Sequence, residues 1–499
     1  MAGKPDAVSV EPLPRIAYAF ARAHGVLVVG QEGEAAVVLV RPDASVDGIA
    51  EVRRVLQRPL LTRPVDAARF ASELARAYND GGAAATMQEE LARDDLAQLM
   101  QEVAPTADLL ADEATQPVIR MINALLLQAL AERASDLHFE PYEARAVVRF
   151  RVDGALRDVV EPPRALHAAL VSRIKIMASL DIAEKRLPQD GRLALHLGGR
   201  SVDVRVSTLP TGPGERVVLR LLDRDAAQLD LAALGMSEGT LASIDRLIRE
   251  PHGILLVTGP TGSGKTTTLY AALSRLPRGS VNMMTVEDPI EYALDGVAQT
   301  QVNPRIALDF ARSLRAILRQ DPDVIMIGEI RDLETAQIAV QASLTGHLVL
   351  ATLHTNDAAS AVTRLADMGV EPYLLSSSLL GVLAQRLVRK LCPACRAPRA
   401  VEPAERRLLA ELGLPVPDAL YAPGGCEACG QGGYRGRTGI YELLRVDEPL
   451  RRAIHDRAGE DAVRVAMRAS GAASLRSDGA RWLADGTTSL AELLRVTRD

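Results

Sequence analysis

The C-terminal half of the chain is predicted to fold as an α/β domain built on a parallel sheet. Four short apolar runs alternate with segments of helical periodicity, and every run ends in polar residues. In a parallel sheet the carboxyl ends of the strands meet at one edge, so these polar endings would converge on one crevice. The runs and their endings are Ile254 to Val257 before a glycine-rich loop, Asn282 to Val286 before Glu287 and Asp288, Val324 to Ile327 before Gly328 and Glu329, and Leu348 to Leu353 before His354.

Length and composition limit the classes of protein to which the chain can belong. Its 499 residues suffice for roughly two to four domains, and 47% hydrophobic residues suffice for packed cores. The formal net charge is −6 and no long basic stripe appears, which argues against a dedicated nucleic-acid binder. The N-terminus lacks the apolar core of a signal peptide, and polar side chains interrupt the longest uncharged stretch, residues 335–356. We therefore expect a cytoplasmic protein without a membrane span.

Two smaller α+β parts are expected before the α/β domain, which would occupy residues 229–499. Residues 1–79 combine short apolar runs with helical periodicity and carry no cluster of catalytic side chains. Residues 80–105 are expected to form a linker, because they begin with DGGAAAT, continue as a polar helix candidate and reach a break near Pro105. Residues 106–228 are predicted to hold a helix at Pro117 to Arg133, strands at Asp136 to Phe139, Ala144 to Val152, Arg192 to Leu197, Val202 to Thr208 and Arg216 to Leu222, and a hairpin turn at Gly198 and Gly199.

The segment after the first apolar run of the α/β domain reads GPTGSGKTT and matches the phosphate-loop pattern G-x-x-x-x-G-K-[ST]. Its glycines allow backbone N–H groups to turn inward around the phosphates of a nucleotide. The lysine can reach the β- and γ-phosphates, and the next threonine hydroxyl can bind Mg²⁺. A glycine-rich turn with a chance lysine is the alternative, but strand, loop and helix follow in the required order. The predicted nucleotide-binding residues are Gly259, Pro260, Thr261, Gly262, Ser263, Gly264, Lys265, Thr266 and Thr267.

Two carboxylates at the ends of apolar runs are candidate catalytic residues for nucleotide hydrolysis. The reaction needs a metal ion in place and a water molecule in line with the γ-phosphate, and two acids can divide these tasks. Glu329 occupies the position from which an acid reaches Mg²⁺ through water, which makes Glu287 the favoured base. A helix cap is the alternative role for either acid. His354, at the polar end of the last run, is predicted to sense the γ-phosphate or to couple subunits.

All four cysteines fall in two C-x-x-C pairs that are separated by 30 residues. Each pair supplies two thiolates on one turn, and two pairs complete the tetrahedral coordination of a structural Zn²⁺. A redox-active dithiol is the alternative for a single pair. The zinc would stabilise an excursion at about residues 388–437 that has few apolar residues of its own. The predicted ligands are Cys392, Cys395, Cys426 and Cys429.

Taken together, these segments resemble the secretion ATPases that power type II protein export, which are relatives of the pilus extension and retraction motors. The resemblance covers nearly the whole chain. GPTGSGKTTTLY is similar to the family's phosphate loop, TVEDPIE to its aspartate box, DPDVIMIGEIRD to its Walker B segment and TGHLVLATLHTND to its histidine box. ASDLHFEP, RVDG, KRLPQDGR and RVSTLPTGPGERVVLRLL resemble the PAS-like domain that precedes the motor core, and the cysteine pairs match the family's zinc module.

The resemblance implies a fold and a set of roles. The fold is an α/β, RecA-like P-loop ATPase core that follows a PAS-like α+β domain and a small N-terminal α+β domain, with a tetracysteine zinc module. ATP, Mg²⁺ and Zn²⁺ are the implied ligands, with Glu287 as the catalytic base and Glu329 as the Walker B acid. Gly328 stands where many phosphate-loop ATPases have an aspartate, and the family shares this glycine. Arginines that reach nucleotide phosphates or bridge domains are expected at Arg205, Arg220, Arg315 and Arg319.

The resemblance also implies a homo-hexamer that powers pseudopilus assembly in type II secretion. An ATPase that extends type IV pili is the alternative within the superfamily, and a nucleotide-gated scaffold or a zinc-containing nucleic-acid binder are alternatives of other classes. Since no membrane span is expected, residues 1–79 are predicted to dock to the cytoplasmic domain of an inner-membrane platform protein, with acidic lipids as a further contact. The chain would then be cytoplasmic and peripherally recruited to the inner membrane, without nucleic acid as a partner.

Overall fold

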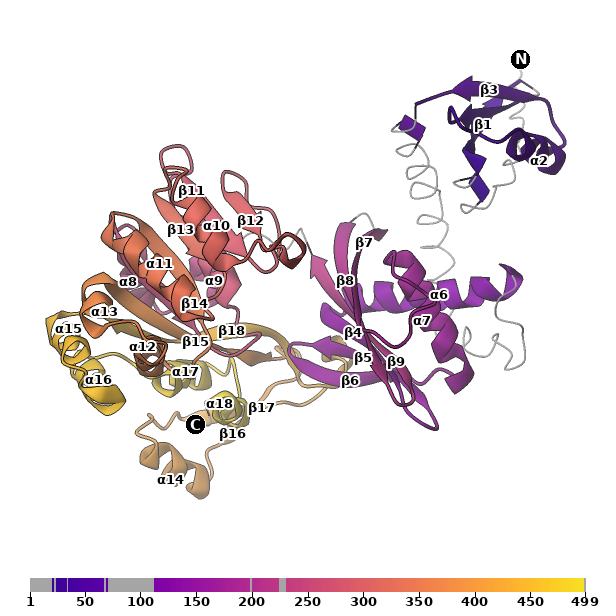
Figure 1. Cartoon of the computed structure of the whole chain (residues 1–499). Coiled ribbons are helices and arrows are strands. Elements are labelled where there is room, and N and C mark those ends of the chain that lie inside the picture. The colour runs from indigo at the N-terminus through magenta and orange to yellow at the C-terminus, as the bar shows by residue number, and fades with distance from the viewer. Residues whose placement is uncertain are drawn as a thin grey trace, which may run out of the picture. The chain divides into compact units, whose positions relative to one another are not determined.

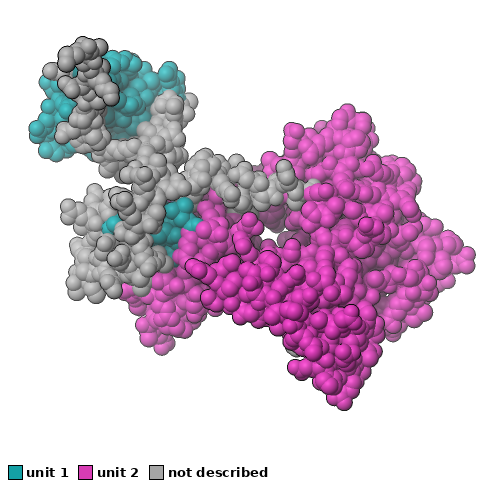
Figure 2. Space-filling model, turned by 180° about the vertical axis from the view of Figure 1, so that it is seen from behind, with its two compact units in different colours: residues 1–127, 196–200 teal, residues 128–195, 201–499 magenta. Residues whose placement is uncertain are grey.

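The computed structural model describes residues 20–21, 24–33, 35–66, 69–70, 112–197, 200–223 and 230–497. The chain divides into two compact units, residues 1–127 with 196–200 and residues 128–195 with 201–499 (Figure 2). The expected linker at 80–105, with its helix candidate, and the expected turn at Gly198 and Gly199 lie outside the described residues. Among the described residues, no helix has both the length and the apolar character needed to cross a bilayer.

The N-terminal part is a three-stranded sheet in the order β1-β2-β3 (Figure 1). β1 and β2 pair antiparallel, whereas β3 runs parallel to β2 after the connecting helix α2. Valine-rich strands suit a half-buried pleated surface, and Ser45 caps α2 by accepting a hydrogen bond from Gly48 N–H at 3.0 Å. The elements are β1 Val26–Glu32, β2 Ala35–Val40, α2 Val46–Leu56 and β3 Leu60–Pro64.

A six-stranded sheet follows in the order β6-β5-β4-β9-β8-β7, with antiparallel pairing at β6-β5, β5-β4, β4-β9 and β9-β8. The helix α7 contacts β4 and β9 and buries Leu170, Val171 and Ile174. The five expected strands and the expected helix are present, together with β6 and α7, for which no element was expected. The elements are α6 Asp112–Ala131, β4 Ala134–Pro141, β5 Ala146–Val152, β6 Ala155–Val160, α7 His167–Met177, β7 Gln189–Leu197, β8 Arg200–Thr211 and β9 Gly214–Asp223.

The next sheet has seven strands in the order β12-β11-β13-β14-β10-β15-β18 (Figure 1). Neighbouring strands are parallel except for the last pair, in which β18 runs antiparallel to β15. The four predicted runs are β10, β11, β13 and β14, so the predicted parallel sheet is confirmed, and three further strands extend it. The strands are β10 Gly253–Thr258, β11 Met283–Glu287, β12 Ala298–Gln301, β13 Val324–Ile327, β14 Leu348–Leu353, β15 Leu379–Leu391 and β18 Tyr434–Arg445.

Helices cover both faces of the seven-stranded sheet. Successive side chains of β10 enter different hydrophobic clusters, with Ile254 and Leu256 in one and Leu255 and Val257 in the other. Side chains of α10, α11 and α12 complete the first cluster, and side chains of α8 and α9 complete the second. This layering is typical of a doubly wound α/β domain. The helices are α8 Glu238–Leu247, α9 Lys265–Ser274, α10 Phe310–Ile317, α11 Leu333–Leu344, α12 Ala358–Asp367 and α13 Pro372–Ser378.

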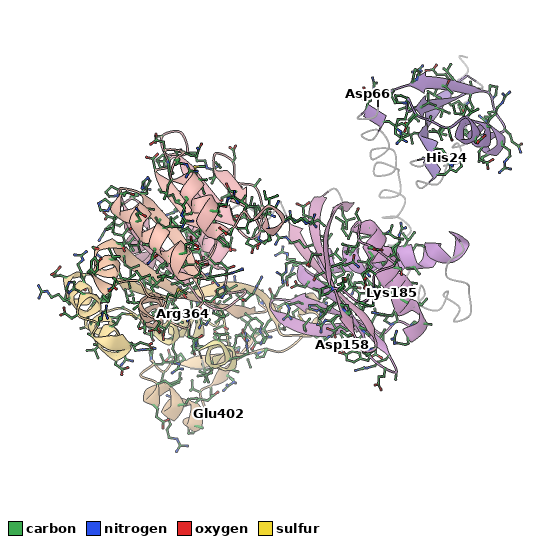
Figure 3. The ribbon with its side chains drawn as sticks, in the orientation of Figure 1. His24, Asp66, Asp158, Lys185, Arg364 and Glu402 are labelled. Carbon is green, nitrogen blue, oxygen red and sulfur yellow. The ribbon has the colours of Figure 1, made fainter. Side chains whose placement is uncertain are left out.

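The cysteine-bearing excursion between β15 and β18 contains a hydrophobic cluster, which corrects the expectation that few apolar residues support it. Glu402, labelled in Figure 3, and Glu405 cap α14 reciprocally. The apolar residues that the excursion buries together with side chains of α17 and α18 are Val401, Leu409, Leu414 and Leu420. The elements are β16 Ala397–Ala400, α14 Pro403–Glu411, β17 Ala419–Ala422 and η5 Glu427–Cys429, followed after β18 by α15 Glu448–His455, α16 Gly459–Ala469, α17 Leu475–Ala484 and α18 Leu490–Val496.

Candidate nucleotide site and metal centre

The phosphate loop lies between the buried strand β10 and the helix α9, where the sequence places it. Gly262 and Gly264 have φ angles of +78° and +86°, a region that glycine occupies without strain. A Cβ atom at Gly259 would lie 2.5 Å from the carbonyl oxygen of Gln385, so the close approach of β15 also requires glycine at this position. The glycines therefore allow the loop to bend tightly against the neighbouring strand.

Lys265 begins α9, and only 8% of its surface is exposed. Its Nζ donates to Gly259 O at 2.8 Å and to Pro260 O at 3.3 Å, so the side chain curls back along the loop. Burial lowers the pKa of Lys265 to about 8, and Glu329 opposes this effect. The Ser263 hydroxyl is buried and has no hydrogen-bond partner in the described part of the chain. A cationic amine, an unpartnered hydroxyl and the N–H groups at the start of a helix are donors that phosphate oxygens accept, so the loop fits nucleotide phosphates.

Glu329 follows β13 and lies beside two nitrogen-bearing side chains. Its carboxylate forms an ion pair with Arg331 and lies 3.4 Å from His354 Nε2. Arg331 also reaches the carboxylate of Asp288 at 3.7 Å, which connects the aspartate box to the Walker B segment. Burial lowers the pKa of His354, and the charge of Lys265 lowers it further, so this ring is mostly neutral near pH 7. The structure thus brings Glu329, His354 and Lys265 into one electrostatic neighbourhood.

Glu287 ends β11 and is 2% exposed, and hydrogen bonds hold both of its carboxylate oxygens. The Tyr270 hydroxyl donates to one oxygen, and Thr285 Oγ1 at 2.6 Å and Gln299 Nε2 at 3.1 Å donate to the other. Burial raises the pKa of Tyr270, so the phenol keeps its proton and stays a donor. Tyr292 packs edge-on against Tyr270, with ring centroids 4.7 Å apart. The candidate base is therefore held inside the protein by donors from α9, β11 and β12.

Two of the four predicted arginines belong to the six-stranded sheet, and they have different partners. Arg205 on β8 donates to Ile290 O at 2.8 Å and lies 3.4 Å from the carboxylate of Glu291, both in the aspartate box. Arg220 on β9 instead pairs with Asp136 of β4 at 2.8 Å. Arg205 therefore reaches the segment that follows Glu287, whereas Arg220 contacts its own sheet.

Arg315 lies in the last turn of α10, and Arg319 follows the end of this helix in the segment that leads into the amino end of β13. Arg315 pairs with Glu334, and Arg319 donates to Arg315 O at 2.7 Å. Glu334 lies in the first turn of α11, which follows the carboxyl end of β13, so Arg315 pairs with a residue of a different segment from the phosphate loop. Within the described part of the chain, neither Arg315 nor Arg319 forms a hydrogen bond or an ion pair with the phosphate loop.

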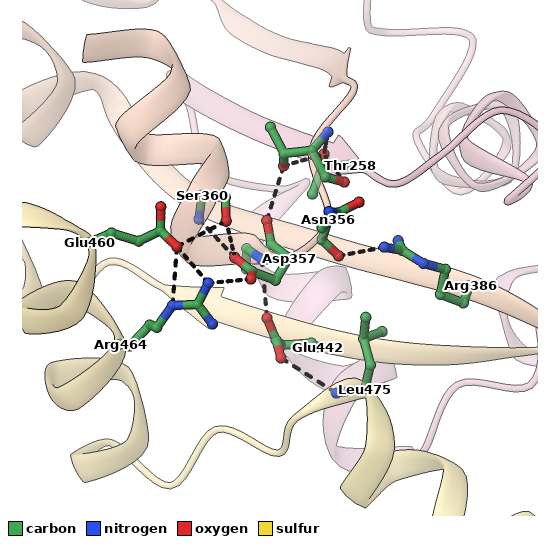
Figure 4. Close-up of polar contacts among 11 residues, drawn as sticks. Thr258, Asn356, Asp357, Ser360, Arg386, Glu442, Glu460, Arg464 and Leu475 are labelled. Carbon is green, nitrogen blue, oxygen red and sulfur yellow. Dashed lines mark hydrogen bonds and ion pairs between the residues drawn. The ribbon is translucent and has the colours of Figure 1, made fainter. Parts of the chain in front are cut away.

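A network of polar side chains holds the segment that follows His354 (Figure 4). Asp357 caps α12 by accepting from Ser360 N–H at 2.8 Å, and Arg464 of α16 donates to the same carboxylate at 2.6 Å. Burial opposes ionisation, but hydrogen bonds from Ser360, followed by the charge of Arg464, lower the pKa of Asp357. Glu442 of β18 accepts from the backbone N–H groups at the start of α12 and of α17. These contacts tie the C-terminal helices to the histidine box.

The four cysteine side chains gather at the end of β15 and around η5. All four sulfur atoms lie within 4.8 Å of one another, with 3.9 Å between those of Cys392 and Cys426 and 3.8 Å between those of Cys395 and Cys429. Tetrahedral zinc at about 2.3 Å from each sulfur would separate the sulfurs by about 3.8 Å. Backbone N–H groups donate to the sulfurs of Cys395 and Cys429 at 3.2 Å. The donor set therefore fits one tetrahedral metal ion.

Comparison with known proteins places the chain in a family. Residues 111–495 match the profile of the family described as type II/IV secretion system protein. The chain belongs to this family. Residues 15–78 of this secretion system protein also match the profile of an N-terminal domain of GSPII protein E.

Relatives of this secretion system protein match nearly its full length. The type II secretion system protein HxcR of Pseudomonas aeruginosa is 59% identical over 97% of this chain and 99% of its own. The type II secretion system ATPase E of Vibrio cholerae is 52% identical over 98% of both chains. The crystal structure of the pilus retraction motor PilT with bound ADP aligns with a TM-score of 0.51 and 25% identity, over 76% of this chain and 97% of that chain. The α/β fold of this secretion system protein therefore has a solved counterpart in a nucleotide-binding motor.

Three side chains around the site of this secretion system protein were not predicted from the sequence. Tyr270 holds Glu287, Arg331 pairs with Glu329, and Gln385 donates to the phosphate loop. Tyr270 lies in the helix that begins at the loop, and Arg331 lies two residues after Glu329, so closeness in sequence was a usable signal for both. Gln385 is 122 residues from its loop partner and had no such signal.

Proposed function

We propose that this chain is the ATPase of a type II secretion system, which hydrolyses ATP to ADP and phosphate to drive pseudopilus assembly and protein export across the outer membrane. The observation that carries the proposal is the phosphate loop with its buried Lys265 close to Glu329, in a chain 52% identical to a type II secretion system ATPase. Relatives at 52% and 59% identity that are named as type II secretion proteins favour this role over an ATPase that extends type IV pili.

Each residue of the candidate site has a separate task in the proposed reaction. The loop N–H groups and Lys265 bind the β- and γ-phosphates of ATP. Mg²⁺, held by the Thr266 hydroxyl and through water by Glu329, would neutralise charge that develops on the phosphates. Glu287 takes a proton from the attacking water and must first leave its interior donors, so we infer that it acts only in a closed state. His354, beside Glu329, reports the presence of the γ-phosphate.

Arginines from outside the phosphate loop complete the proposed site in a homo-hexamer. Arg205 and Arg220 approach from the six-stranded sheet, and the contact of Arg205 with the aspartate box supports this direction. Arg315 and Arg319 act on the nucleotide of a neighbouring subunit, since among the described residues their side chains contact Glu334 and Arg315 O and not the phosphate loop of their own chain. Planar guanidinium groups suit the charge of a transferring phosphoryl group, so hydrolysis would depend on assembly.

The remaining parts of the chain are proposed to connect the ATPase to the membrane. Residues 1–79 dock to the cytoplasmic domain of an inner-membrane platform protein, 80–105 form a linker, and 106–228 are the PAS-like domain. Residues 229–499 are the RecA-like ATPase domain, in which the module at 388–437 binds Zn²⁺ through its four cysteines. The protein is cytoplasmic and peripherally recruited to the inner membrane, where acidic lipids add to the contact.

The catalytic part of the proposal predicts different results for two substitutions. Lys265→Ala should remove nucleotide binding and ATP hydrolysis together, because the loop loses its cation. Glu287→Gln should bind ATP normally yet release phosphate at least about 10²-fold more slowly, the scale for loss of a general base. Binding is measured with a fluorescent ATP analogue and turnover by phosphate release. Glu250→Gln, an exposed carboxylate that follows α8, is the matched control and should retain full activity.

Normal turnover by Glu287→Gln would show that another group is the base, and full activity of Lys265→Ala would refute an ATPase at this loop. The pathway is tested by co-purification from cells with the full chain and with residues 80–499. A secretion-platform protein of the inner membrane should co-purify with the full chain and not with the shortened chain. Recovery of a pilus-platform protein instead would favour the pilus extension ATPase.

A further inference from the structure

Gln385 on β15 is a buried polar side chain to which the proposed reaction gives no role. It is 1% exposed, its Nε2 donates to Ser263 O at 2.7 Å, and its Oε1 accepts from Thr268 Oγ1 at 2.9 Å. We propose that Gln385 is a positioning residue that sets the orientation of the Ser263–Gly264 peptide in the phosphate loop. The proposal rests on the proposed function, because the orientation matters only if the loop binds phosphates.

The planarity of the peptide bond turns this hydrogen bond into a constraint on the loop. In a trans peptide the carbonyl and the N–H point in opposite directions. Because the Ser263 carbonyl points at Gln385, the N–H of Gly264 points away from β15. This places one more donor on the side of the loop that is left for an anion.

Without a hydrogen bond from outside the loop, the orientation of the Ser263–Gly264 peptide would not be fixed. Gly264 has φ +86°, and glycine adopts positive and negative φ with similar ease, so the peptide can flip at small cost. A flipped peptide would present the Ser263 carbonyl oxygen to the phosphates in place of the Gly264 N–H. One hydrogen bond from a rigid strand is therefore enough to select the orientation that binds phosphate.

Thr268 determines which end of the Gln385 amide faces the loop. Its hydroxyl, in the first turn of α9, donates to Oε1, so the amide nitrogen faces Ser263. The backbone of β15 approaches the loop at the same point, since a Cβ at Gly259 would lie 2.5 Å from Gln385 O. Strand, loop and helix thus meet at a single glutamine.

The test measures ADP affinity and thermal stability in the full-length protein. ADP is the probe because it places a phosphate in the loop without involving the hydrolysis step. Gln385→Met keeps the length and most of the volume of the side chain but cannot donate, so we expect ADP to bind about tenfold more weakly, equivalent to about 1.4 kcal/mol. Thr268→Val removes only the group that orients the amide and should weaken binding about threefold.

Val388→Ala is the matched control, because Val388 is buried on the same strand but in the cluster shared with the C-terminal helices. It should lower the melting temperature and leave ADP affinity unchanged. Wild-type affinity in Gln385→Met, or an equal loss of affinity in Val388→Ala at matched stability, would overturn the proposal. If Gln385→Met does not fold, unchanged affinity in Thr268→Val would overturn it instead. Wild-type ADP affinity in Lys265→Ala would refute the nucleotide site itself, which distinguishes the two failures.

Discussion

Lys265 is a cation that the fold holds away from water before any phosphate reaches it. Two loop carbonyls accept its hydrogen bonds, and burial lowers its pKa to about 8. Glu329 favours the charged form, whereas Arg386 disfavours it. An incoming phosphate would add negative charge at the loop and raise the lysine pKa again. We therefore expect proton uptake to accompany the proposed nucleotide binding.

This coupling predicts how ADP affinity depends on pH. Below about pH 8 the free lysine is already charged, so affinity is flat. Above it, binding takes up a proton and affinity falls, by about tenfold between pH 7.5 and pH 9. His354 titrates below this range because its pKa is lowered. Calorimetry in buffers with different ionisation enthalpies measures both the affinity and the proton uptake.

Lys265→Arg is the control for this pH dependence, because a guanidinium stays charged throughout the range. Its ADP affinity, even if weaker, should not change between these pH values. A pH-independent affinity in the wild-type protein would contradict a lowered lysine pKa.

The sequence predicts which residues form the candidate site but not which side chains hold them or how deeply they are buried. The loop glycines and Lys265 follow from a local pattern, because a phosphate loop is one continuous turn. The partners of Glu287 come from α9, β11 and β12, and only the folded sheet brings Tyr270, Thr285 and Gln299 together. Nothing in the spacing of these residues indicates that the side chain of Glu287 is buried in the protein interior.

At the level of elements, apolar runs predicted the centre of the seven-stranded sheet and missed its flanks. β10, β11, β13 and β14 are covered by helices on both faces and read as continuous hydrophobic segments. β15 ends in the mixed sequence QRLVRKL, of which Val388 packs against α17 and α18, and β12 is the short polar edge strand AQTQ. Such strands owe their form to their neighbours, which the sequence alone does not show.

The element that carries the cysteines yields a prediction about metal. The purified protein should contain one Zn²⁺ per chain, because four sulfurs lie at tetrahedral spacing. Cys392→Ser should lose the zinc and lower the stability of the C-terminal region, without directly altering contacts to nucleotide. Elemental analysis and calorimetric unfolding measure the two effects.

The buried cluster of α14 sets the size of this effect. Leu409 and its neighbours pack against α17 and α18, so the module should loosen and not unfold completely. Leu409→Ala, which leaves the cysteines intact, is the control and should keep the zinc while losing about 2 kcal/mol or more of stability. Protein that was never exposed to a chelator and that contains no zinc would refute the metal site.

At the level of the whole molecule, the roles proposed for Arg315 and Arg319 predict that subunits share active sites. The double variant Arg315→Ala with Arg319→Ala should be nearly inactive alone, since no neighbour supplies the cations. Lys265→Ala is also inactive, but its arginines are intact. A mixture of the two should hydrolyse ATP several-fold faster than the sum of the separate proteins, because some intact loops then face intact arginines. The activity per chain should also rise with protein concentration.

The double variant Arg305→Ala with Arg312→Ala, two exposed arginines from η4 Pro304–Ile306 and from α10, controls for loss of surface charge and should stay active alone. A mixture that only matches the sum of its parts would show that Arg315 and Arg319 do not act across subunits. Activity that does not vary with concentration, from monomer to oligomer, would show that assembly is not required.

The hydrogen bonds on Glu287 would also limit the consumption of ATP. With its carboxylate turned inward, the proposed base would leave bound ATP unhydrolysed in a chain that has no partners. The consumption of ATP would then follow the number of assembled secretion systems and not the number of ATPase chains. Overproduction of the protein should therefore not deplete cellular ATP.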